Sequence, residues 1–152
     1  MPDPEASMKA ALEEARRAAE AGEVPVGAVV TSGGRIIARS HNQVETLHDA
    51  TAHAEMLALT QAAEAVGDWR LEGATLFVTL EPCAMCTGAI LLARVDRVVY
   101  GAADPVAGAC GSVLNLAADT RLPRQVEVEG GVMARECGEL LKRFFKDLRE
   151  QR

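Results

Sequence analysis

Two short motifs supply three side chains that suit one metal ion, and they constrain the fold more than any other feature of the chain. The motifs are His53-Ala54-Glu55 and Pro82-Cys83-Ala84-Met85-Cys86. An imidazole and two thiolates are the soft or borderline donors that zinc prefers. A structural zinc site normally has four protein ligands, whereas a catalytic site keeps its fourth position for water. The fold must therefore bring two distant segments together, and three ligands indicate a catalytic site.

Glu55 has a different expected role from the three ligands. It lies two residues from His53, about 200° round an ideal helix, and is not expected to bind the same ion. Zinc lowers the pKa of its bound water to roughly 7, which makes hydroxide available to attack a base. A carboxyl beside that water could take its proton, protonate a ring nitrogen and later protonate the departing amine. The pattern H-x-E…P-C-x-x-C is the signature of zinc-dependent nucleobase deaminases, so we predict Glu55 to be the proton shuttle.

Each part of the pattern also has an ordinary explanation. A lone Cys83-x-x-Cys86 is equally typical of a redox pair or of half a structural zinc site. Taken alone, His53 is a typical core histidine and Glu55 a typical surface acid of a helix. The joint occurrence of the two motifs favours the metal site over these alternatives.

The remaining cysteines and histidines are left out of the predicted ligand set. Cys137 falls on the apolar stripe of a helix, and Cys110 lies between Ala109 and Gly111, so both are expected to be small packed residues. His41 and His48 lie in loop positions that suit a supporting or surface role as well as a ligand role.

The pattern of apolar residues and turn residues predicts one α/β domain over residues 1–152. Strands are expected over residues 24–31, 35–39, 74–80, 97–100 and 126–128. Helices are expected over residues 5–21, from 51 or 52 to about 66, and over 83–93. The first two strands flank Ser32-Gly33-Gly34 and form a hairpin, while the third and fourth flank a helix and pair in parallel. The result is a single mixed sheet covered by helices.

The last segment is predicted to be an amphipathic helix. Cys137, Leu141, Phe144 and Leu148 recur at helical spacing and form one apolar stripe. This stripe is expected to pack on the core, so that truncation after Gly138 cripples stability.

Charge gives a mixed indication about nucleic acid. The formal net charge is −6, which argues against a surface coated with basic residues. Residues 140–152, however, contain five basic and two acidic side chains, which suits either phosphate contacts or a solvated helix face. The chain has no apolar run long enough to cross a bilayer and no signal-peptide pattern, so a cytoplasmic protein without a membrane partner is expected.

Beyond the two motifs, most of the chain resembles bacterial tRNA-specific adenosine deaminases. The matching segments are Val24-Pro-Val-Gly-Ala-Val-Val30, His41-Asn42, Asp49-Ala-Thr-Ala-His-Ala-Glu55, Val78-Thr-Leu-Glu-Pro-Cys-Ala-Met-Cys86, Gly101-Ala-Ala-Asp104, Gly111-Ser-Val-Leu-Asn115 and Gly131-Val-Met-Ala-Arg-Glu-Cys137 through Phe144-Phe145. The resemblance implies a three-layer α/β/α cytidine-deaminase-like fold with a central mixed five-stranded sheet. It also implies a homodimer with one zinc ion per subunit that converts the wobble adenosine of a tRNA anticodon stem-loop to inosine.

The resemblance implies roles for individual residues as well. His53, Cys83 and Cys86 would be the zinc ligands and Glu55 the proton shuttle. Asn42 would contact the flipped adenosine, and Asp104 would lie against the anticodon loop beside it. From their own type and position, Asn42 is a turn residue and Asp104 begins a loop.

Within the resemblance, the basic face of the last helix becomes an expected RNA contact. This face carries Lys142, Lys146 and Arg149.

Two departures from the family pattern fall in segments expected to approach RNA. Val106 stands where the family usually has a lysine, and Leu122-Pro123-Arg124 stands where it commonly has an Asn-His pair. Together with the acidic composition, they keep open a deaminase of a free base or nucleotide, of the guanine or cytosine type. A zinc-stabilised binding module without activity is a third alternative, which the presence of Glu55 beside only three ligands disfavours.

Overall fold

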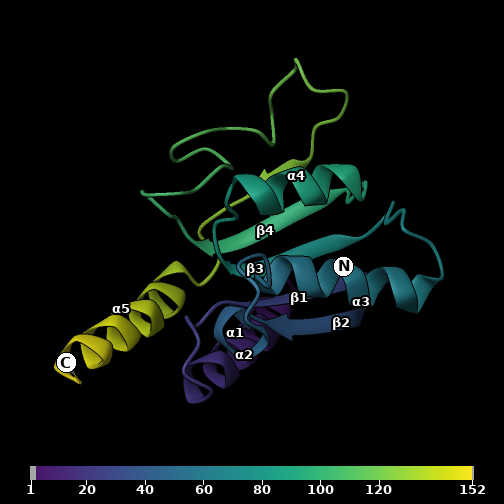
Figure 1. The fold of residues 1–152 in the computed structure, drawn as a ribbon. Helices are drawn as coiled ribbons and strands as arrows, with labels where there is room; N and C mark the ends of the chain where they lie inside the picture. The colour runs from purple at the N-terminus through teal and green to yellow at the C-terminus, as the bar shows by residue number, and fades with distance from the viewer. Residues whose placement is uncertain (1–2, 152) are drawn as a thin grey trace.

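The structure, a computed structural model, describes residues 3–151 and contains one five-stranded sheet with strand order β2-β1-β3-β4-β5 (Figure 1). The strands are β1 (Gly27–Ser32), β2 (Arg35–His41), β3 (Thr75–Leu80), β4 (Arg97–Ala102) and β5 (Glu127–Glu129). All five lie within about three residues of their predicted positions, as expected for sequence-based boundaries. The mixed five-stranded sheet is therefore confirmed.

The pairing of the strands follows the predicted connections. β1 and β2 form an antiparallel hairpin whose turn contains Gly33 and Gly34, with φ values of 59° and 78°. Two left-handed residues are what a tight hairpin turn requires, and glycine adopts them without a steric cost. β1 also pairs antiparallel with β3, while β3, β4 and the edge strand β5 run parallel to one another.

Helices cover both faces of the sheet and produce three layers (Figure 1). One face packs against α1 (Pro4–Glu20) through a core cluster that includes Met8, Leu12 and Phe77. The other face packs against α3 (Ala54–Val66) and α4 (Ala84–Leu92) through a larger apolar cluster. The α/β/α architecture is therefore confirmed.

Two metal-motif residues precede their helices instead of lying inside them. α3 begins at Ala54, later than predicted, because His53 has an extended backbone and is the N-cap. Cys83 is likewise the extended N-cap of α4.

The short helix α2 (Val44–Leu47) was not predicted, since four residues are too few to show a helical period.

The last helix, α5 (Ala134–Glu150), corrects the expectation that its whole apolar stripe packs on the core. Cys137 is buried, but Phe144 is only partly buried and Leu148 is exposed. Figure 1 shows why: α5 lies against the sheet near its N-terminal end and then runs away from the body. Truncation after Gly138 would remove Leu140 and Leu141, which pack against the two core clusters, so the predicted loss of stability rests on these two residues and not on Phe144 or Leu148. Arg152, counted in the basic segment, lies outside the described residues.

No helix among the described residues is both long and apolar enough to span a bilayer.

Candidate active site

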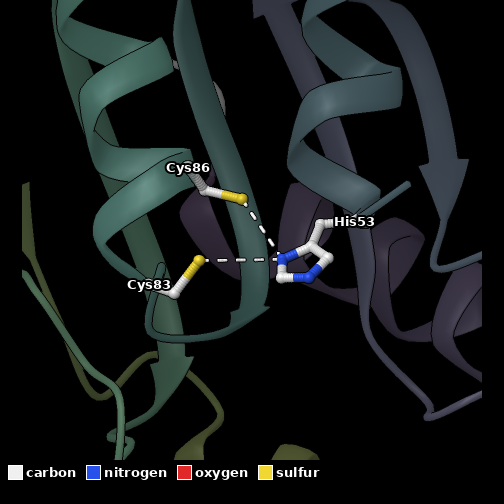
Figure 2. A group of neighbouring side chains, drawn as sticks. All are labelled: His53, Cys83 and Cys86. Atoms are coloured by element: carbon white, nitrogen blue, oxygen red, sulfur yellow. Dashed lines mark hydrogen bonds between the residues drawn. The ribbon is translucent and has the colours of Figure 1, made fainter. Parts of the chain in front are cut away.

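The three predicted metal ligands meet between the N-terminal ends of α3 and α4 (Figure 2). The Nδ1 atom of His53 lies 3.7 Å from the Sγ of Cys83 and 3.5 Å from the Sγ of Cys86. A tetrahedral zinc ion with ordinary bond lengths holds its nitrogen and sulfur ligands about 3.5 Å apart. Both the spacing and the chemistry of these donors fit zinc.

The electrostatics of this group also suit a cation. Hydrogen bonds from the Cys86 thiol and the His53 imidazole lower the pKa of Cys83 to about 3. Sharing its proton with Cys83, together with burial, raises the pKa of Cys86. The two N-terminal helix ends contribute further positive potential that favours thiolates. The site therefore favours a thiolate at Cys83, and a bound metal ion would favour deprotonation of Cys86 as well.

Glu55 lies in the first turn of α3, with only 4% of its surface exposed. Burial raises the pKa of its carboxyl from 4.5 to about 7, although the neighbouring His53 works in the opposite direction. The metal-ligand group in the described part of the chain is His53, Cys83 and Cys86, without Glu55. Glu55 is therefore placed to exchange protons near neutral pH beside the ligands.

A cavity of about 630 Å³ opens onto this centre. Its polar lining includes His53, Glu55, Cys83, Asn42 and Asp104. Its apolar lining includes Val24, Val26, Val44, Ala54, Leu80 and Ala107. A concave, mostly apolar pocket with a few convergent polar groups is the usual form of a small-ligand site.

The structure brings Asn42 and Asp104 into the cavity wall, and it also shows the local turn roles that their types indicate. The Asn42 amide donates to the Val24 carbonyl at 3.3 Å and accepts from the Val44 N–H at 3.3 Å. The Asp104 carboxylate accepts from the N–H groups of Val106 and Ala107 at 2.9 and 3.2 Å. Each side chain therefore stabilises its own loop at the edge of the site.

Two buried carboxylates that sequence reasoning missed also line the cavity, Glu23 and Glu81. Glu23 accepts hydrogen bonds from the N–H groups of Glu45 and Thr46 at the start of α2. Glu81 follows the apolar strand β3 and directly precedes Pro82. A charged residue at the end of a buried strand next to a ligand motif was the available signal for Glu81, whereas no local pattern marks Glu23.

The cysteines and histidines left out of the ligand set lie elsewhere. Cys110 and Cys137 are buried free thiols, which confirms the prediction of packed residues. The His41 ring lies 3.1 Å from the Glu14 carboxylate, and His48 is exposed.

α5 contributes an unexpected edge to the cavity. Phe144, Phe145 and Leu148 line it, which accounts for the incomplete burial of the apolar stripe. The predicted RNA contacts Lys142, Lys146 and Arg149 are exposed on the same helix and do not line the cavity.

The two family departures occupy different surfaces. Val106 is 84% exposed and lies between Asp104 and Ala107, which both line the cavity. Leu122, Pro123 and Arg124 line a separate hollow of about 610 Å³ beside α4. Only the first departure is therefore next to the candidate active site.

Comparisons with known proteins agree with this geometry. Residues 2–149 match the family model described as MafB19-like deaminase. A tRNA-specific adenosine deaminase of Bacillus subtilis is 52% identical over 152 residues, which cover 100% of this chain and 94% of that protein.

Solved structures show the same fold. One from a study of A-to-I editing by tRNA:A34 deaminases at the wobble position of transfer RNA has a TM-score of 0.87 and 46% identity, covering 90% of this chain and 99% of the other. A guanine deaminase from Nitrosomonas europaea has a TM-score of 0.83 at 26% identity, covering 95% and 85% respectively.

Proposed function

The chain belongs to the family of bacterial tRNA-specific adenosine deaminases, and we propose that it converts the wobble adenosine of a tRNA anticodon stem-loop to inosine by hydrolytic deamination. The observation that carries the proposal is the single cavity that joins His53, Cys83 and Glu55 to Asn42 and Asp104. The substrate is assigned because a tRNA-specific relative matches the whole chain, whereas the guanine deaminase is a more distant neighbour.

His53, Cys83 and Cys86 would hold one zinc ion per subunit. When bound, zinc lowers the pKa of a water ligand and so supplies a hydroxide nucleophile near neutral pH. Glu55 would then perform the proton transfers. Its carboxylate takes one proton from the attacking water and delivers it to the ring nitrogen beside the amino-bearing carbon. It then takes the second proton from the oxygen that has added to that carbon and delivers it to the departing amine, which leaves as ammonia. A pKa of about 7 supports both accepting and donating steps at neutral pH.

Asn42 and Asp104 would orient the adenosine and the adjacent part of the anticodon loop. Both line the cavity, although they come from separate segments of the chain. A base must leave its stack to enter such a pocket. The apolar side chains of Val24, Val26 and Leu80 suit the faces of a planar base.

α5 would bind the part of the RNA next to the target base. Phe144 and Phe145 line the cavity edge and suit stacking of unpaired bases. Lys142, Lys146 and Arg149 are exposed and form no ion pair among the described residues, which leaves them available for phosphates.

A homodimer is part of the proposal. Apolar side chains are exposed around α4, with Leu92 at 78% and Trp69 at 53%, and they adjoin the apolar hollow lined by Leu122. A contiguous exposed apolar surface is typical of a protein interface. Sedimentation velocity of the zinc-loaded protein tests this assembly, and Leu92→Glu is expected to shift it to monomer.

All four cysteines are free thiols, which suits the reducing cytoplasm in which we place the protein. Cell fractionation followed by immunoblotting would test this location.

The decisive experiment measures ammonia release from an anticodon stem-loop with a wobble adenosine, beside free adenosine, guanine, cytosine and cytidine. Turnover of the stem-loop alone is expected, with inosine found at the wobble position. Turnover of a free base alone would contradict the proposed substrate while leaving the deaminase chemistry in place.

A further inference from the structure

We propose that Glu81 is a positioning residue of the substrate pocket, whose buried carboxylate fastens the loop of residues 103–112 to the turn that carries Cys83. The loop contributes Asp104 and Ala107 to the cavity wall. The inference deepens the proposed function and rests on it for its kinetic consequence, but not for its structural one.

The carboxylate of Glu81 accepts four hydrogen bonds, and all of them come from this loop. One oxygen accepts from the Asp104 N–H at 3.0 Å and from the Ser112 hydroxyl. The other oxygen accepts from the N–H groups of Cys110 and Ser112 at 3.0 and 3.1 Å. One side chain therefore holds both ends of the loop.

Main-chain bonds continue the attachment on either side of this carboxylate. The Glu81 N–H donates to the Ala102 carbonyl at 2.8 Å, and the Ala109 N–H donates to the Pro82 carbonyl at 2.9 Å. Glu81 and Pro82 are the two residues between β3 and Cys83, the N-cap of α4. The loop is thus attached to the two residues that directly precede the metal-ligand residue Cys83.

Neutral donors alone compensate this buried charge. Glu81 is 2% exposed and forms no ion pair among residues 3–151. A buried carboxylate is costly unless its oxygens are satisfied. Its four neutral donors fix the direction of each carboxylate oxygen, so the carboxylate sets the position of the loop that supplies them.

Because Gly108 has no side chain, the Glu81 carboxylate can occupy the space beside it. A Cβ at Gly108 would lie 2.4 Å from the Cδ of Glu81, closer than packed atoms approach. Gly108→Ala therefore displaces the carboxylate without removing a hydrogen-bonding group, although its Cβ would also lie 2.6 Å from the Asp104 carbonyl oxygen. It is a second perturbation of the same attachment, and it acts on the loop backbone as well as on Glu81.

The test compares Glu81→Gln, Gly108→Ala and Ser112→Ala with Leu12→Ala, a core control on the other face of the sheet. Amide hydrogen exchange of the zinc-loaded protein is expected to accelerate in residues 103–112 by at least ~10-fold in the first two variants and less in Ser112→Ala. On the stem-loop, KM is expected to rise at least ~10-fold while kcat stays within about threefold. Zinc content should stay unchanged.

The outcomes separate the two proposals. Unchanged exchange and KM in both Glu81→Gln and Gly108→Ala would overturn the positioning role. An equal rise of KM in Leu12→Ala would also overturn it, because general destabilisation would then explain the effect. Faster exchange in the two variants, with a wild-type protein that is inactive on the stem-loop, would support the fastening of the loop and overturn the proposed function.

Discussion

The Nδ1 atom of His53 lies 3.5 Å from the Sγ of Cys86, although 33 residues separate the two in the chain. The ligands His53 and Cys83 are also the N-cap residues of α3 and α4, and neither forms a side-chain capping bond. A metal ion held by these side chains would join the starts of the two helices. Metal binding should therefore contribute to stability as well as to catalysis.

Chelation is accordingly expected to lower the melting temperature. Zinc at about 100 times its Kd would stabilise the fold by about 2.7 kcal/mol. For a chain of this size, that energy corresponds to a shift of roughly 5–10 °C. Thermal unfolding followed by circular dichroism, before and after treatment with a chelator, measures it. Re-addition of zinc should restore the transition, and a melting temperature independent of metal would contradict the prediction.

Glu55→Ala is expected to keep the fold and the zinc while kcat falls at least ~10²-fold, because positioned acid–base catalysis contributes that much. Single-turnover deamination of the stem-loop and metal analysis measure the two quantities. Glu64→Ala, a change at another acid of α3 whose side chain is exposed, is the matched control. Wild-type turnover in Glu55→Ala would refute the proton-shuttle role.

Glu23→Gln is expected to destabilise the protein at neutral pH, with a loss that shrinks in acid. Burial opposes ionisation, but hydrogen bonds from Thr46 and Glu45 outweigh it and hold the pKa of Glu23 below its ordinary value. A carboxylate with a lowered folded-state pKa stabilises above its unfolded-state pKa, and this stability disappears as the pH falls through the folded-state value.

Urea unfolding of the wild type and Glu23→Gln from about pH 7 to about pH 3 measures the difference between their free energies of unfolding. At neutral pH the loss should be about 1–3 kcal/mol for each N–H left unsatisfied. Thr46→Val removes only the hydroxyl donor to Glu23 and should cost less. If the difference in free energy of unfolding between the wild type and Glu23→Gln grew on acidification, the predicted pH dependence would be contradicted.

Replacing Lys142, Lys146 and Arg149 together by alanine is expected to weaken stem-loop binding with little change in stability, since the three side chains are exposed. Each lost phosphate contact should reduce the slope of log K against log salt by about 0.7. Filter binding across a salt series measures the slope. Arg35→Ala, an exposed charge on β2, should leave it unchanged, and equal slopes for both variants would exclude α5 as an RNA contact.

Val106→Lys is expected to strengthen RNA binding. Val106 is exposed beside the cavity, where a cation would attract the phosphates of a bound loop. KM for the stem-loop should fall about threefold to tenfold at low salt, and the gain should vanish at high salt. Val113→Lys, an exposed position directly after this loop and outside the cavity lining, is the control. No gain at any salt concentration would mean that RNA does not approach this position.

The sequence predicted those parts of the molecule that depend on local pattern. Alternating and continuous apolar runs located all five strands, and the ligand spacing located His53, Cys83 and Cys86. Those residues could be placed together because their types demand a shared ion, a chemical constraint that acts across the chain.

The parts that were missed depend on tertiary contacts. The role of Glu81 depends on a distant loop that returns its N–H groups to that carboxylate. The position of Glu81 beside the ligand motif could have marked the residue as unusual, but it could not have shown what the carboxylate binds. The orientation of α5 was missed for a related reason. Its helical period shows which side chains share a face, but it does not show whether that face meets the core or the opening of a cavity.

The close approach of α5 to the sheet is confined to its beginning. Gly101 of β4 lacks a side chain where the Cys137 thiol packs, and a Cβ there would lie 2.4 Å from that sulfur. The outer turns of the helix carry no comparable packing demand. Substitutions at the exposed positions of these turns should therefore cost little folding free energy, so that this end of the helix can change its surface chemistry while the metal-ligand residues keep their places.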